Sequence, residues 1–60
     1  MKNEMKYAVT FGGNGSLDSL YFSNKKEAIK CANSIKKDFQ EVYLQEQRNF
    51  DYQTIRAIKN

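Results

Sequence analysis

The dipeptide Asn14-Gly15 constrains the fold more than any other feature of the sequence, because it separates two runs of strand-forming residues. Residues 5–11 (MKYAVTF) alternate in the pattern typical of a strand. Residues 17–22 (LDSLYF) form a more polar run, as suits an edge strand. Asn and Gly both tolerate the positive φ angles that a two-residue turn requires. The sequence therefore predicts a β-hairpin whose first strand is central in a sheet.

Residues 25–39 show helical spacing. Ser23 or Asn24 can cap the start of this helix, and Glu27 completes a capping-box pattern with Asn24. At 100° per residue, four apolar side chains lie within about 60° of one another. These are Ala28, Ala32, Ile35 and Phe39. We expect this stripe to pack on one face of the sheet.

The C-terminal part of the chain predicts a second hairpin. Residues 41–48 (EVYLQEQR) alternate, and residues 49–51 (NFD) are typical of a short turn. Residues 52–59 (YQTIRAIK) are rich in strand-forming side chains. The spacing of Ile55 and Ile58 would also suit a short helix, so both interpretations stay open at this point.

The expected fold is α+β, a single domain over residues 1–60 with the order β-β-α-β-β. If the helix covers one face of the sheet, the third strand runs parallel to the second strand. The third strand can then lie beside the first strand and pair with it in the antiparallel direction. We therefore expect an antiparallel four-stranded sheet in the order 2-1-3-4, with one helix on one face.

A chain of 60 residues forms only a small core. Scaffolds of this size usually need a disulfide, a metal or a partner subunit. The chain has one cysteine, Cys31, and no histidine, which excludes an internal disulfide and argues against a structural zinc site. We therefore expect a homodimer.

The residues also argue against catalysis. There is no histidine for acid–base chemistry, and the carboxylates are scattered along the chain. Cys31 lies beside the apolar stripe, where a thiol without a base partner is inert. A deep pocket of roughly a few hundred Å³ is difficult to form in so small a domain. We expect a protein that is not an enzyme and has no cofactor, metal or small-molecule substrate.

The glycine cluster raises the question of a phosphate-binding loop. All three glycines, Gly12, Gly13 and Gly15, lie within four positions. A dinucleotide-binding fingerprint would need a third glycine where Asp18 stands, and a P-loop would need a following Lys. The next element is also a strand, so no helix N-terminus is present to hold a phosphate. We interpret the cluster as a turn.

A single helix covers only one face of the sheet, so we expect the opposite face, which carries Ala8 and Thr10, to be open. This face is the first candidate interaction surface. Tyrosine and arginine are enriched at protein interfaces, whereas tyrosine on a sheet can also stack on bases. No run of aromatic residues typical of RNA-binding sheets is present, which favours a protein partner. An ordinary half-exposed sheet would carry the same side chains. The candidate contact residues are Tyr21, Tyr43, Gln45, Tyr52 and Arg56, with Tyr52 or Arg56 on this face depending on register.

The predicted helix offers an alternative site. Lys26, Lys30 and Lys37 lie opposite the apolar stripe and could contact the phosphates of a nucleic acid. A solvated helix face would account for the same lysines. Arginine, the usual reader of bases, is absent from this segment.

The expected function is protein–protein interaction by a homodimer that binds a larger protein stoichiometrically. The short length, the order of elements and the composition are typical of small phage or mobile-element proteins, which often bind and block a host protein. The hypothesis includes an inhibitor of a host defence protein. No apolar run reaches the length of a membrane span or a signal peptide, so we expect a cytoplasmic protein.

Overall fold

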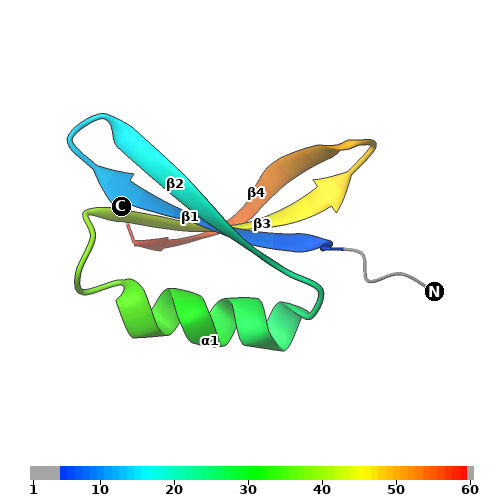
Figure 1. The fold of residues 1–60 in the computed structure, drawn as a ribbon, viewed down its shortest axis with the longest axis horizontal. Coiled ribbons are helices and arrows are strands. Elements are labelled where there is room, and N and C mark those ends of the chain that lie inside the picture. Colours follow the sequence, from blue (N-terminus) through cyan, green and yellow to red (C-terminus); the bar gives the residue numbers. More distant parts are fainter. Residues whose placement is uncertain (1–4, 60) are drawn as a thin grey trace.

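The structure is a computed structural model that describes residues 5–59, and it confirms the predicted fold. Its strands form one antiparallel sheet in the order β2-β1-β3-β4. The single helix of the described part lies on one face of this sheet (Figure 1). In chain order the elements are β1 (Tyr7–Gly13), β2 (Ser16–Phe22), α1 (Lys25–Ile35), β3 (Glu41–Arg48) and β4 (Asp51–Lys59).

The first hairpin turns at Asn14-Gly15, as predicted. Asn14 has φ 56° and Gly15 has φ 81°, and positive φ at both central residues is characteristic of a type I′ turn. Gly13 lies opposite Ser16, so the pairing continues up to the turn itself. As a result β1 ends at Gly13, two residues later than the alternation of residues 5–11 indicated, and it begins at Tyr7.

The helix begins at the predicted cap. The Asn24 side chain accepts hydrogen bonds from the backbone N–H groups of Lys26, at 2.8 Å, and Glu27, at 3.3 Å. These bonds satisfy two of the donors that a helix N-terminus leaves free.

The helix ends at Ile35, so the prediction that it reaches residue 39 is wrong. The Asp38 N–H donates to the Ile35 carbonyl at 2.9 Å, which closes a turn after the last helical residue. Phe39 still reaches the core, but from the connection to β3, with its ring centroid 4.7 Å from that of Phe11. Helical spacing placed Phe39 on the correct side of the chain although the residue is not helical.

The core lies between α1 and the two central strands. Val9 of β1 and Val42 and Leu44 of β3 are at most 1% exposed, and the helix contributes Ala28 and Ala32 to the same cluster. Alanine at these two helix positions lets the helix backbone approach the sheet closely. The stripe predicted from spacing is therefore confirmed for the residues that are helical.

The last segment is a strand, and its isoleucines are accommodated by bulges. Two register shifts against β3 leave Ile55 and Ile58 as extra residues of β4. Each bulge inserts one residue and so changes which face the following side chains occupy. Ile55 and Ile58 consequently both pack toward the core, although a spacing of three residues would place them on opposite faces of a regular strand.

The glycines of the first hairpin provide a test of this fold. A Cβ atom at Gly12 would lie 2.0 Å from the Ser16 carbonyl oxygen, whereas a Cβ at Gly15 would meet nothing within 4 Å. We expect Gly12→Ala to lower the free energy of unfolding by about 3 kcal/mol or more. Gly15→Ala should lower it by about 1 to 2 kcal/mol, the cost of a left-handed alanine. Urea denaturation measures both, and equal losses would contradict the close approach at Gly12.

Candidate functional site

The centre of the sheet face opposite the helix is closed to solvent. Ala8 is 0% exposed and Thr10 is 9% exposed, although both side chains point away from α1. The prediction that this face is open is therefore wrong at its centre. The sheet is strongly twisted, and the tips of both hairpins lie away from the helix (Figure 1). Among the described residues no further helix or strand lies over this face, so the sheet covers these two residues by its own curvature.

Two tyrosines from opposite edges of the sheet meet over this face. Tyr21 of β2 and Tyr52 of β4 have ring centroids 5.4 Å apart, with their planes inclined by 55°. In a flat sheet the edge strands of four would lie roughly 14 Å apart, so the contact requires the curvature. The Tyr52 hydroxyl also donates to the Met5 carbonyl, just before β1. The small side chain of Ala8, which pairs with Tyr21, leaves room for this closure.

A chain of polar side chains crosses the same face with one member on each strand. Thr10 donates its hydroxyl proton to Gln45 Oε1 at 2.8 Å, so the 3.0 Å bond between Thr10 and Ser19 is donated by Ser19. Gln45 in turn donates to the Thr54 hydroxyl at 3.3 Å. Among the described residues, no buried side-chain N or O atom lacks a partner. These groups bind one another and link the four strands across this face.

Tyr43 lies on this face beside Glu41. The Tyr43 hydroxyl donates to the Glu41 carboxylate at 2.7 Å. This hydrogen bond, followed by desolvation and the nearby negative charge, raises the pKa of Tyr43 above its ordinary value of 10.0. The neutral phenol is therefore the form that the folded protein holds.

The Tyr43–Glu41 bond predicts a specific alkaline titration. The pKa of Tyr43 is higher in the folded protein than in the unfolded chain. The hydrogen bond to Glu41 therefore stabilises the fold fully below the unfolded pKa, and this stabilisation is lost as the pH rises through the folded pKa. Ultraviolet titration of tyrosinate should show a component, from Tyr43, that ionises above the ordinary pKa of tyrosine. Glu41→Gln should shift that component to lower pH, and Tyr43→Phe should remove it. A titration curve unchanged by Glu41→Gln would contradict the assignment.

Arg56 does not join the tyrosines. The first bulge of β4 places it opposite Leu44 of the core, and it lines a hollow between β4 and α1 with Ile29, Asn33 and Lys36. The structure therefore brings together four of the five residues predicted for the tyrosine face. They are Tyr21, Tyr43, Gln45 and Tyr52.

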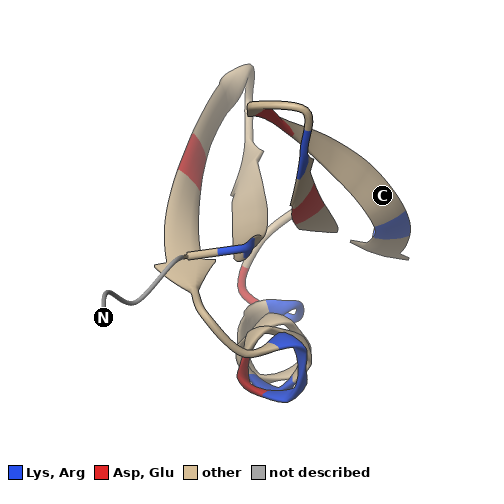
Figure 2. Ribbon diagram, turned by 90° about the vertical axis from the view of Figure 1, so that its right-hand side faces the viewer, with Lys and Arg blue, Asp and Glu red and all other residues tan. Residues whose placement is uncertain are grey.

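The lysines of the alternative site are all exposed. Lys26, Lys30 and Lys37 lie on or just after α1, and Figure 2 shows the basic segments of this helix in blue. Arg48 and Glu46 form the one ion pair found among residues 5–59. The three lysines therefore have no carboxylate partner within these residues.

The most exposed large apolar residue lies at the tip of the second hairpin. Phe50 is 99% exposed and has φ 70°, and Asn49 before it has φ 50°. These two residues form a two-residue turn between Arg48 and Asp51. The sequence predicted the turn but not a site within it. One feature of the sequence could have indicated this site, because Phe50 occupies a turn position at which glycine is favoured.

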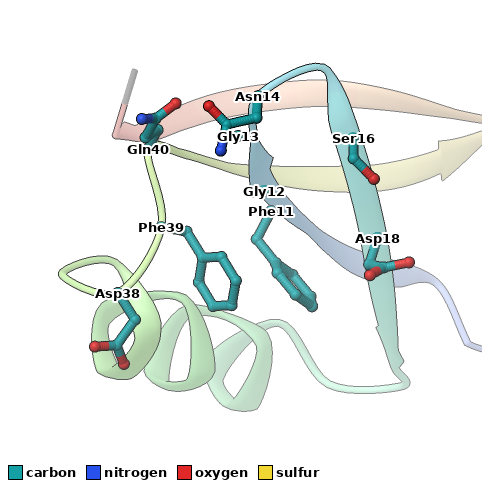
Figure 3. A pocket seen from close by; sticks show the side chains of 9 residues that line it. All are labelled: Phe11, Gly12, Gly13, Asn14, Ser16, Asp18, Asp38, Phe39 and Gln40. Atoms are coloured by element: carbon teal, nitrogen blue, oxygen red, sulfur yellow. The ribbon is translucent and has the colours of Figure 1, made fainter.

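An open hollow of about 410 Å³ lies beside the first hairpin. Figure 3 shows the rings of Phe11 and Phe39 side by side in it, between the hairpin and α1. Asp18 of β2 and Asp38 of the connection after α1 stand on its walls. Within residues 5–59, no three side chains of the metal-binding types lie close enough to hold an ion.

The chain was compared with protein-family models, curated proteins and solved structures, and none of them gave a significant match. Among the residues that the structure describes, no helix has the length and apolar character needed to cross a membrane.

Proposed function

We propose that this protein is a non-enzymatic protein-interaction module, a homodimer that acts by stoichiometric binding to a larger protein. Phe50, at the tip of the β3–β4 hairpin, is its principal contact residue. A phage-encoded or mobile-element-encoded inhibitor of a host defence protein in the cytoplasm would act in this way. The observation that carries the proposal is the full exposure of Phe50 at a positive φ angle.

Phe50 is unfavourable for the isolated chain in two respects. A left-handed conformation costs a residue with a side chain about 1 to 2 kcal/mol. A fully exposed phenylalanine also gains none of the roughly 1.5 to 3 kcal/mol that burial of its side chain would contribute. Burial of the ring in a partner's pocket would recover the second term. Local strain and exposed aromatic side chains are both concentrated at functional contacts.

The contacts within the tyrosine face support this choice of site. Tyr52 binds Tyr21 and the Met5 carbonyl, and Gln45 is bonded on both sides. We assign these residues a role in holding the sheet curved. The curvature points the β3–β4 hairpin away from the helix and from the first hairpin, which leaves its tip free for a partner (Figure 1).

Phe50→Gly separates stability from binding. It creates an Asn-Gly turn, the preferred sequence for positive φ at both positions, so the free energy of unfolding should rise by about 1 kcal/mol. For a domain of this size the melting temperature should rise by about 4 to 8 °C. The same variant should lose the partner. Calorimetry measures the first effect, and quantitative affinity capture from an extract of the native host cell measures the second.

Phe50→Ala is the matched control, because it removes the ring but keeps a side chain at positive φ. It should lose the partner without the gain in stability. Proteins captured at equal stoichiometry by the original chain and by both variants would show that Phe50 is not the contact.

The alternative is a nucleic-acid-binding module. The exposed Lys26, Lys30 and Lys37, without a carboxylate partner among residues 5–59, support it. Replacing all three by glutamate should leave capture through Phe50 unchanged if the first proposal is correct. Binding of single- or double-stranded nucleic acid that falls steeply with salt and is abolished by this triple variant would favour the alternative.

A further inference from the structure

The two edges of the sheet differ in their readiness to pair with another strand. β4 carries two register shifts, at Ile55 and Ile58, and the cations Arg56 and Lys59. Bulges and charges are common means of preventing edge-to-edge association. β2 has no bulge, since all seven of its residues pair with β1 in unbroken register, and it carries no cation. The β2 edge is therefore the one that can accept a further strand.

Three large side chains of β2 are exposed. Leu17 is 51% exposed, Leu20 45% and Tyr21 53%. Asp18 is the strand's one charged residue. For a chain with a net charge of +3, this strand is the part of the surface where two copies would meet little repulsion.

The backbone of β2 has a defined pattern of free groups. In the type I′ turn the Ser16 N–H binds the Gly13 carbonyl, so Gly13 and Ser16 are a hydrogen-bonded pair. Antiparallel pairs alternate between bonded and non-bonded. It follows that the N–H and C=O groups of Leu17, Ser19 and Tyr21 point away from β1, toward the free edge.

We propose that a second copy of this chain pairs with β2, antiparallel, with Ser19 opposite Ser19 of the second copy. This register matches all three outward-facing residues at once, because Leu17 of each copy then pairs with Tyr21 of the other. It also sets Asp18 opposite Leu20, so no like charges face each other. The proposal deepens the homodimer of the proposed function by giving its interface.

The resulting dimer is a continuous eight-stranded sheet with both helices on one face, because the two-fold axis is normal to the sheet. The interface does not use the second hairpin, since β1 and β3 lie between β2 and β4. Phe50 of each copy stays free for a partner. Dimerisation and partner binding can therefore be tested separately.

Cysteine cross-linking tests the register. Opposite residues of a bonded antiparallel pair have Cα atoms about 5.5 Å apart, within the range of a disulfide. In a Cys31→Ser background, which leaves no other thiol, Ser19→Cys should form a covalent dimer on mild oxidation. Thr54→Cys, on the opposite edge, is the matched control and should stay monomeric on a denaturing gel. Cross-linking at Thr54 but not at Ser19 would overturn the proposal.

A charge at the same position provides a second test that does not depend on oxidation. Ser19→Lys places two lysines opposite each other and should raise the dimer dissociation constant about fivefold or more, whereas Thr54→Lys should leave it unchanged. Sedimentation measures both, with circular dichroism to confirm folding. If the original chain is a monomer at all concentrations, the homodimer fails as a whole. If a dimer persists but is unaffected by Ser19→Lys and does not cross-link at Ser19, only this interface fails.

Discussion

A contact between two aromatic rings, Tyr21 on β2 and Tyr52 on β4, joins the outer strands of the sheet above the strands that separate them. Ala8 and Thr10 of the central strand are buried beneath this closure, although no second layer of helix or strand covers them in the described chain. In this way β1 is protected on both faces, by α1 on one side and by curvature on the other. A small domain that lacks an internal disulfide thereby gains a second buried surface from a single sheet.

The same closure decides which surfaces are left for other molecules. Ser19, Thr10, Gln45 and Thr54 bind one another across the four strands, so the tyrosine face is largely occupied by its own contacts. Two features are not explained by the stability of the isolated chain. One is the exposed ring of Phe50 on a strained turn, and the other is the regular edge of β2 with its exposed Leu17 and Leu20. The proposed function and the proposed dimer use one of these features each.

The order and pairing of the strands could be predicted because they depend on local signals. Asn14-Gly15 defines the first hairpin, and connection rules then allow few sheet orders. The curvature could not be predicted, because alternation indicates which face a side chain occupies but not how strongly the sheet bends. For the same reason Ala8 was expected on an open surface. The spacing of Ile55 and Ile58 did not distinguish a strand from a short helix. Bulges can place residues three apart on one face of a strand, and they have no clear sequence signal.

The central claim is that the edges of the sheet meet over β1, and nuclear magnetic resonance tests it directly. With the four tyrosine rings assigned, nuclear Overhauser cross-peaks between the ring protons of Tyr21 and Tyr52 should be present. They should persist in Phe50→Gly, which changes only the turn between β3 and β4. Absence of these cross-peaks in the original, folded chain would show an open tyrosine face and contradict the account.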